Sequence, residues 1–242
     1  MTVMFREIAD GVHVLRYPVL DVNSVLVVGH TAALLVDTLS CAEQGEELAM
    51  AVREVTRLPV TVVNTHAHFD HIFGNATVAR LLGVEEIHAH PTVVRRLRDH
   101  AESMVEDAWH ECRLIAPEIA ESVRRTEILT PNRPVHGIAA VDLGGRSVRI
   151  WHPGAAHTTA DLVLLAGEVF IAGDLVEEGA EPDTADADLA GWPVTLSELL
   201  PLMHGPVVPG HGAVVDADFV RAQRDRLAVL ASGADVVNPG PA

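Results

Sequence analysis

The stretch "NTHAHFDH", residues 64–71, follows a short β-branched run and gathers four side chains that commonly bind metals. His66 and His68 are two positions apart, so in an extended chain they point the same way and can bind one ion. Asp70 and His71 come after the chain begins to turn and can face a second ion. A solvated loop does not need these side chains, and a core could not bury them unpaired. The stretch therefore predicts a metal site.

Three further predicted strands end in a loop that carries a residue of the same kind. These strand-and-loop stretches are "VRIWHPGAAH" (148–157), "VFIAGD" (169–174) and "PVVPGH" (206–211), which lead to His157, Asp174 and His211. Loops that leave one edge of a sheet can bring their side chains to a single point. Imidazole and carboxylate ligands without thiolates suit zinc, iron or manganese, and they do not suit a structural zinc site rich in cysteine.

The composition indicates a globular chain with an acidic surface. The 242 residues are 48% hydrophobic, and no apolar run is long enough to span a bilayer. The formal net charge of −17 argues against a nucleic-acid partner, because an acidic surface repels phosphate. Cys41 and Cys112 are too few for a disulfide framework. Because the start of the chain shows no export signal, we expect a cytoplasmic protein with neither disulfides nor a membrane partner.

Hydrophobic periodicity predicts a single domain of strands and helices. The expected strands are 11–18, 23–29, 31–38, 60–64, 86–91 and 206–212; the expected hairpins are 141–154 and 161–176; the expected helices are 41–58, 74–83, 189–204 and 216–231. Residues 92–130 are expected to be mostly helical, with a break near Pro117. The predicted domain covers 1–236, with 92–136 as a helical insertion that forms a lid or pocket wall and 237–242 as a frayed tail. Strands with helices in both halves suggest a sheet sandwich covered by helices.

Four stretches, in this order, resemble the metallo-β-lactamase-fold hydrolase superfamily: "THAHFDH" (65–71), "HPGAAHTTADLVL" (152–164), "FIAGDLV" (170–176) and "VPGHG" (208–212). The resemblance covers most of the chain and implies an α+β fold, an αββα sandwich with the site at one edge of its sheets. The ligands that it implies are His66, His68 and His157 for a first metal, Asp70, His71 and His211 for a second, and Asp174 as the bridge between the two. The expected cofactor is zinc, with two ions per chain, and manganese or iron are the alternatives.

Two positions distinguish this chain from many secreted β-lactamases of the superfamily. Asp174 stands where they carry a cysteine ligand, and His71 stands where they carry an arginine after the motif aspartate. The chain therefore looks more like the glyoxalase II, lactonase and general hydrolase branches. The "GRTDF"-type stretch associated with glyoxalase II and the persulfide dioxygenases is missing, since "EEGAEPDTADADLAGW" occupies 177–192.

The resemblance implies a dinuclear metal-dependent hydrolase of a small-molecule acyl substrate, an ester, thioester or lactone. A hydroxide shared by the two ions would attack the carbonyl, and Asp70 would be the catalytic residue that orients it or transfers a proton. No GxSxG stretch supports a covalent serine route. Three alternatives stay open: a β-lactamase with a cysteine-free, B3-like site, a mononuclear iron dioxygenase of the same fold, and a non-catalytic metal-binding module. The oligomeric state is left open.

The remaining histidines and the tryptophans have simpler interpretations. "HAH" at 88–90 imitates the first motif without the following Asp-His, and the alternative for His90 is an outer contact that orients a ligand. Trp109, His110 and Trp192 either line a substrate pocket or pack against the core.

Overall fold

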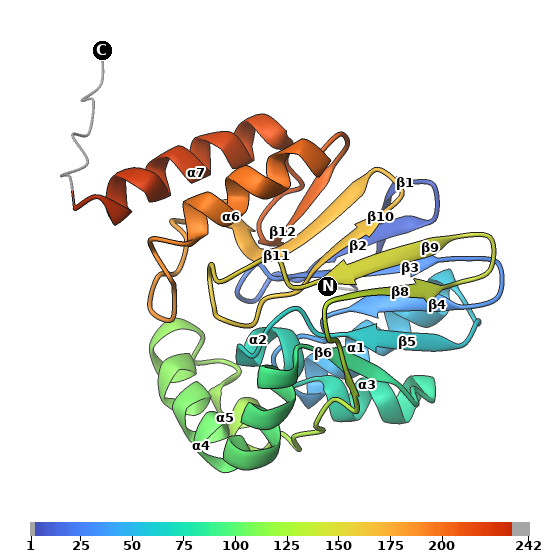
Figure 1. Ribbon diagram of the computed structural model, residues 1–242. Coiled ribbons are helices and arrows are strands. Elements are labelled where there is room, and N and C mark those ends of the chain that lie inside the picture. The colour runs from blue at the N-terminus through green and yellow to red at the C-terminus, as the bar shows by residue number, and fades with distance from the viewer. Residues whose placement is uncertain (1–2, 234–242) are drawn as a thin grey trace.

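Two β-sheets lie face to face at the centre of the computed structural model, which describes residues 3–233 (Figure 1). The first sheet has the order β1-β2-β3-β4-β5-β6-β7, and the second has the order β12-β11-β10-β9-β8. The strands of the first sheet are β1 (Arg6–Ala9), β2 (Val12–Arg16), β3 (Asn23–Val28), β4 (Ala33–Val36), β5 (Val60–Val63), β6 (Ile87–Ala89) and β7 (Arg133–Pro134). The strands of the second are β8 (Ile138–Asp142), β9 (Ser147–Trp151), β10 (Val163–Ala166), β11 (Val169–Glu177) and β12 (Val207–His211).

The direction of the strands places several loops at one edge of the sandwich. The first sheet is antiparallel from β1 to β4 and parallel from β4 to β7. The second is antiparallel from β8 to β11, and β11 pairs in parallel with β12. Parallel neighbours end at the same edge of a sheet, so the loops after β4 and β5 leave together, as do the segments after β11 and β12.

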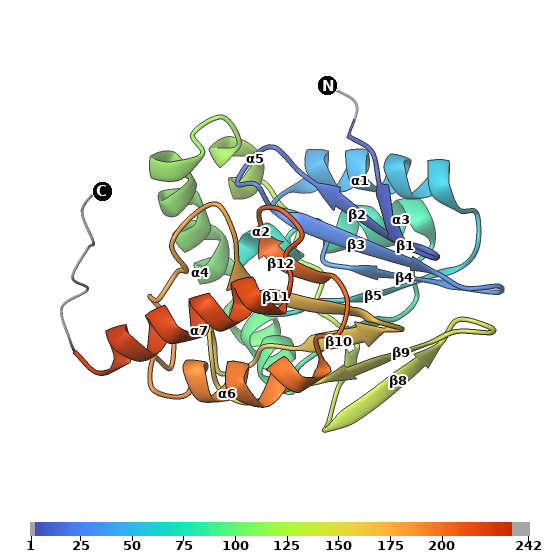
Figure 2. The same cartoon turned by 90° about the horizontal axis from the view of Figure 1, so that it is seen from above.

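Helices cover the outer face of each sheet, which gives four layers (Figure 2). Helices α1 (Ala42–Val55) and α3 (Asn75–Leu82) cover the first sheet, and α6 (Trp192–Leu199) and α7 (Ala217–Ala231) cover the second. Between the sheets lies an aliphatic core that includes Val25, Leu34, Ile150 and Leu164. Strand β3 is buried along almost its whole length, because one of its faces meets that core and the other meets the helices. The predicted αββα sandwich is confirmed.

Local sequence signals account for where several helices begin and end. Helix α3 stops at Gly83, which has a left-handed φ of 67° that most side chains disfavour. Helix α7 starts after Asp216, whose carboxylate accepts hydrogen bonds from the N–H groups of Asp218 and Phe219. The predicted helix 189–204 is shorter, because it passes into a 3-10 turn, η1 (Leu200–Leu202), at Pro201, which lacks the N–H that an α-helix needs.

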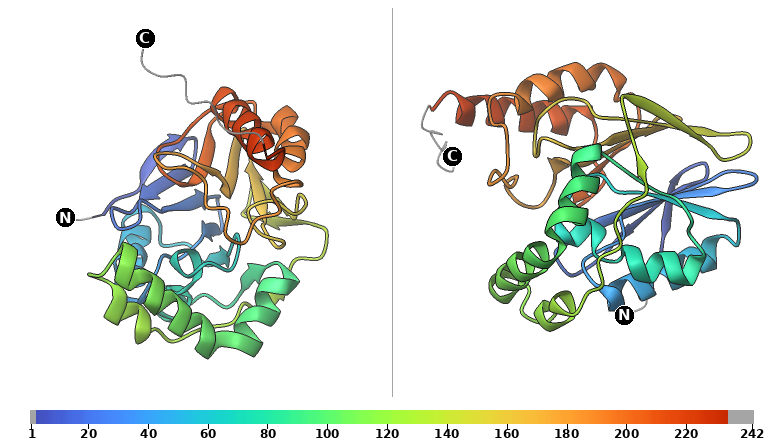
Figure 3. Two further views of the ribbon diagram at one scale, coloured as in Figure 1. Left: turned by 90° about the vertical axis from the view of Figure 1, so that its left-hand side faces the viewer. Right: turned by 60° about the horizontal axis from the view of Figure 1, so that its bottom comes forward.

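A pair of helices lies beside the end of the sandwich where these loops emerge (Figure 3). Helix α4 (Pro91–Ile115) is kinked at His100, and α5 (Ala120–Arg124) follows it after the predicted break. The buried side of α4 includes Leu97, Met104 and Cys112 and packs in one cluster with Phe69 of the motif stretch and with Phe73.

The periodic patterns did not predict three short elements. These are β1, the single-turn helix α2 (Phe69–Ile72) inside the motif stretch, and the two-residue strand β7. The predicted frayed tail, 237–242, lies outside the described residues. Within residues 3–233, none of the helices combines the length and the apolar composition needed to cross a bilayer.

Candidate metal centre

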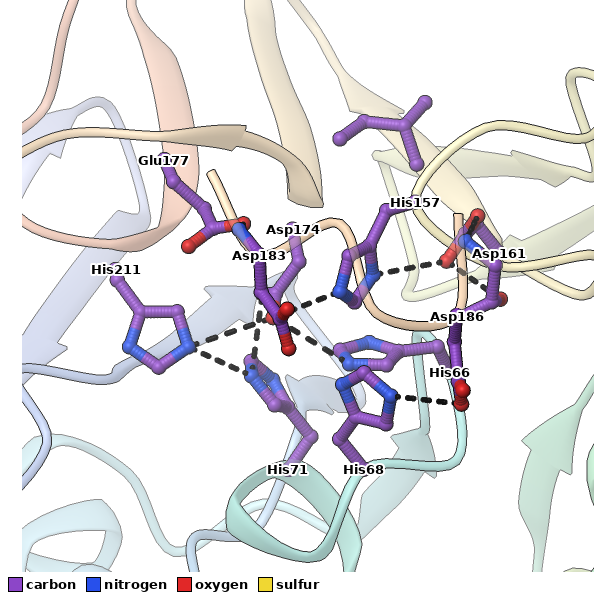
Figure 4. A network of polar contacts seen from close by, with 12 residues as sticks. His66, His68, His71, His157, Asp161, Asp174, Glu177, Asp183, Asp186 and His211 are labelled. Atoms are coloured by element: carbon purple, nitrogen blue, oxygen red, sulfur yellow. Dashed lines mark hydrogen bonds and ion pairs between the residues drawn. The ribbon is translucent and has the colours of Figure 1, made fainter. Parts of the chain in front are cut away.

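The ligand-type residues predicted from four strand ends meet at one place (Figure 4). His66 and His68 follow β5, and His71 belongs to α2. The segment after β9 delivers His157, and β12 ends on His211. His66, His68, His71 and His211 therefore come from a strand end or from the turn that follows one, and such positions have little freedom to move. Asp174 was predicted in a loop after a strand, but it lies inside β11, because pairing with β12 continues as far as Glu177 and His211.

The residues form two groups, and within each group the potential ligand atoms all lie within 4.8 Å of one another. The first group is His66, His68, His157 and Asp174, and the second is Asp70, His71 and His211. Asp174 lies between them. Its Oδ2 is 3.4 Å from Nε2 of His66 in the first group and 3.4 Å from Nε2 of His211 in the second, while its Oδ1 is 3.1 Å from Nε2 of His71. The structure therefore brings all seven predicted site residues together.

Two glycines allow the strands to come this close to Asp174. Any Cβ at Gly210 on β12 would overlap Oδ1 of Asp174, so the neighbouring strand needs glycine there. Gly173, immediately before Asp174, has a left-handed φ of 54°, and a Cβ there would be 3.1 Å from the side chain of Thr65. Glycine at both positions lets β11 present its carboxylate to histidines from the other sheet.

The centre contains buried polar atoms that have no hydrogen-bond partner within the described residues. They include Nε2 of His66, Nε2 of His157 and Oδ1 of Asp174. Leaving such atoms unpaired is unfavourable, and the few that occur in native proteins usually mark a ligand site. Imidazole nitrogen and carboxylate oxygen are the donors that zinc, manganese and iron accept. The donor set therefore fits a metal centre.

Each histidine is held from outside through its other ring nitrogen. Thr65 Oγ1 lies 3.0 Å from the ring of His66, and Asp186 Oδ2 lies 3.4 Å from that of His68. Asp37 Oδ2 is 2.8 Å from the ring of His71, and the Leu20 carbonyl is 2.8 Å from that of His211. His157 has a longer ion-pair contact, 3.6 Å, with Asp161 Oδ1. Such contacts fix the tautomer and the direction of a ligand ring, and they raise its basicity.

Asp37 connects one histidine of each group. It lies just after β4, is 2% exposed, and accepts hydrogen bonds from the N–H and hydroxyl of Thr65 and from Nδ1 of His71. Since the Thr65 hydroxyl donates to Asp37, its oxygen accepts from Nδ1 of His66, which leaves Nε2 of His66 as a lone-pair donor. Sequence analysis did not predict this role, because a single aspartate after a strand, far from the motif in the chain, forms no pattern.

The charges at the centre are strongly coupled. Burial opposes ionisation of Asp174, but the surrounding histidines, His71 first, outweigh it and hold the pKa of Asp174 well below its usual value. Burial lowers the pKa of His66 far below 6.5, and the nearby Asp174 only partly offsets this. For His211, burial also favours the neutral form, but Asp174 outweighs it and raises the pKa to about 10. An ionised Asp174 thus supplies negative charge where positive charge gathers.

A cavity of about 420 Å³ opens onto the centre. Its lining includes His68, Asp70, Asp174 and His211 on one side. On the other side it includes residues of α4 and of the segment 181–186, and the sequence did not identify those individually. The predicted insertion thus supplies part of the cavity lining.

Among the other candidates, His88 and His90 lie away from the centre, whereas the ring of Trp192 packs on His157 with the centroids 5.6 Å apart. His88 is on β6, 3.8 Å from Glu86, and His90 accepts a hydrogen bond from Thr92 N at the start of α4 and packs its ring on His152. In the described part of the chain, these contacts include none of the ligand candidates. The cavity lining, likewise among described residues, includes neither of the tryptophans proposed for it nor His110. Trp192 is fully buried and donates to the Leu175 carbonyl, so its core interpretation is the better one.

Comparison with known proteins agrees with this arrangement. The chain is similar in structure to a metallo-β-lactamase from Pontibacter korlensis, with 23% identity over 93% of this chain and 99% of that one, and a TM-score of 0.70. It is also similar to a metallo-β-lactamase from Pseudomonas aeruginosa solved in its mono-zinc form, with 19% identity over 96% and 97% of the two chains and a TM-score of 0.70. A third, determined after exposure to ceftazidime, gives 15% identity over 95% and 98%, with a TM-score of 0.72. These identities establish a shared fold. The family-defining sequence pattern matches residues 17–211, and the chain belongs to the metallo-β-lactamase superfamily.

Proposed function

We propose that this chain is a dinuclear metal-dependent hydrolase of a small acyl substrate, an ester, thioester or lactone. The observation that carries the proposal is the convergence of two ligand groups on Asp174 beside one cavity. His66, His68 and His157 would hold a first ion and Asp70, His71 and His211 a second, with Asp174 bridging them. Zinc suits these donors, and manganese or iron are the alternatives. Bound dications would supply Lewis acidity and lower the pKa of water toward neutrality.

Asp70 is the proposed catalytic residue. Its Oδ2 is 3.3 Å from Nε2 of His211, and the residue lines the cavity while remaining largely buried. A carboxylate in this position can hold the attacking water by a hydrogen bond and accept its proton. It can then return that proton to the leaving oxygen, sulfur or nitrogen.

The size and charge of the molecule support a small-molecule substrate. A cavity of about 420 Å³ falls within the range that proteins use for small ligands. The net charge of −17 makes a nucleic-acid substrate unfavourable. Both cysteines are free thiols, which supports the cytoplasm as the proposed compartment.

A β-lactamase is the main competing activity, because the similar solved structures are metallo-β-lactamases. Against it stands the lining of the cavity. β-Lactam antibiotics carry a carboxylate, and the cationic side chain among the described lining residues, Arg96, lies 3.5 Å from Asp186. We therefore expect weak β-lactam turnover.

The test is an assay of protein loaded separately with zinc, manganese or iron, against esters, thioesters, lactones and β-lactams, under nitrogen and in air. We expect about two ions per chain and oxygen-independent hydrolysis of an ester, thioester or lactone with zinc or manganese. Turnover that required both iron and oxygen would indicate a dioxygenase instead. A β-lactam as the best substrate would indicate a β-lactamase, and bound metal without turnover of any substrate would indicate a binding module.

A further inference from the structure

The wall of the cavity that α4 and the segment 181–186 form is acidic. One face of α4 lines it with Met104, Asp107, Ala108, Glu111 and Ile115, which recur at helical spacing. The segment 181–186 adds Asp183 and Asp186 beside them. These carboxylates are separate from Asp70 and Asp174, which belong to the metal centre.

The positive charge available to balance this wall is small. Besides the histidines of the centre, the described lining contains one cation, Arg96, and Asp186 already engages it at 3.5 Å. Within residues 3–233, Asp107 and Glu111 have no hydrogen-bond or ion-pair partner for their carboxylates. Asp183 uses its carboxylate only to accept the local N–H of Ala185. Among residues 3–233, three carboxylates therefore line the cavity without an ion-paired cation, and the nearby positive charge that acts on Glu111 is a through-space contribution from His68.

Two buried acidic side chains line the inner end of the cavity. Glu177 is 7% exposed and lines the cavity; its Oε1 accepts from Asp183 N, and its Oε2 has no partner among the described residues. Asp174 is 4% exposed and also lines the cavity, but the histidines of the centre balance its charge, with Nε2 of His71 3.1 Å from its Oδ1. The uncompensated negative charge therefore belongs to the exposed wall, beside apolar side chains such as Phe69, Met104 and Ile115.

We propose that this cavity selects acyl substrates that carry an organic ammonium group next to a small apolar body, and that Glu111 and Asp183 determine this specificity. The inference rests on the proposed hydrolase function and adds the substrate's charge to it. An ammonium group on the acidic wall would meet uncompensated carboxylates, whereas a substrate carboxylate there would meet like charge and no free cation. Glu111 and Asp183 are exposed at the wall, so dissolved salt should weaken the preference.

The first test uses three acetyl thioesters that differ mainly in charge: acetylthiocholine, its neutral isostere 3,3-dimethylbutyl thioacetate, and the anionic S-acetyl-3-mercaptopropionate. At low ionic strength we expect kcat/KM to fall by about tenfold at each step from cation to neutral to anion. Glu111→Gln combined with Asp183→Asn should shrink the cation-to-anion ratio by about tenfold or more. Glu102→Gln, on the same helix but outside the cavity lining, is the matched control and should keep the wild-type ratio.

The second test measures binding without turnover. Calorimetry on the metal-loaded protein gives dissociation constants for cysteamine, 2-mercaptoethanol and mercaptoacetate, and we expect the order of affinity to follow charge, cation first, and to flatten in the double variant and in about 0.5 M salt. Equal affinities and equal kcat/KM for the three charges would overturn the selection while leaving hydrolysis intact. A preserved cysteamine preference without turnover of any thioester would overturn hydrolysis and keep the selection. Neither binding nor turnover would overturn both.

Discussion

The two sides of the cavity are built differently. On the metal side, His66, His157 and Asp174 are almost fully buried: the two histidines lie in the loops after β5 and β9, and Asp174 lies inside β11. The Thr65 hydroxyl contacts the ring of His66, and the Asp161 carboxylate contacts the ring of His157. On the other side, Glu111 and Asp183 are exposed and belong to a helix face and a loop. Under the two proposals, the reaction would depend on residues that the sandwich holds in place, whereas substrate preference would depend on exposed residues that can change without disturbing the fold.

Asp174→Ala should have the largest effect, and this effect should be confined to the metal side. The variant removes the carboxylate that both ligand groups share, so metal content and activity should drop together, by more than the roughly 10- to 100-fold typical of outer contacts. Asp174→Asn should keep the shape but lose the charge that offsets two dications. Elemental analysis and kcat/KM measure both effects. Full activity with two bound ions in Asp174→Ala would rule out the shared role.

Asp37→Asn should have the next largest effect, although Asp37 would touch no ion. Its backbone φ of 62° is tolerated by Asn and strained for Ala, so Asn isolates the hydrogen-bond change. An amide cannot accept from Thr65 and from His71 as the ionised carboxylate does, so we expect a 10- to 100-fold loss of zinc affinity and a fall of about 1–3 kcal/mol in the free energy of unfolding. Chelator competition and urea unfolding measure these.

The control for this prediction is Asp99→Asn, a surface carboxylate paired with the adjacent Arg98. It should change neither zinc affinity nor stability appreciably, because such exposed pairs contribute little. If Asp37→Asn behaved like this control, the contrast between a buried, hydrogen-bonded metal side and an exposed acidic wall would be wrong.

The same contrast explains what the sequence could predict. Strands such as β3, β9 and β11 have apolar patterns that depend only on local burial, and the ligand candidates follow such apolar stretches in the sequence, so both were visible in the chain. The extent of β11 was not, because that strand continues past Asp174 to Glu177. The order of the layers came from the resemblance, since alternating patterns do not state which strands pair. The roles of Asp37 and of the acidic wall were not predicted, because they arise only when distant segments meet. Asp37 is 34 positions from His71, and Glu111 and Asp183 come from separate segments that line the same cavity.

Asp186→Asn should have a smaller effect, because Asp186 belongs to the wall yet touches the metal side. Its Oδ2 is 3.4 Å from Nε2 of His68, and this contact lowers the pKa of Asp186 to about 2. The side chain is 47% exposed, so solvent screens the interaction, and we expect a loss of zinc affinity below about tenfold that salt reduces further. Chelator competition at two ionic strengths gives the answer. An effect as large as that of Asp37→Asn would show that Asp186 belongs to the metal side of the cavity.

The smallest expected effect concerns whether α4 is a fixed wall or a lid, and two thiols report on it. Cys112 lies on the buried side of α4 and Cys41 at the start of α1, both in the cluster beneath the wall. Burial raises the pKa of Cys41 to about 11 and that of Cys112 to about 12, so at pH 8 at most about one in a thousand of either thiol is ionised and reactive. We propose that α4 is a fixed wall, and expect both thiols to resist Ellman's reagent in the folded protein and to react together when it unfolds. Cys41→Ala leaves Cys112 as the reporter and assigns the signal. Cys112 reacting under native conditions, well ahead of global unfolding and slowed by a bound substrate analogue, would show that α4 opens as a lid.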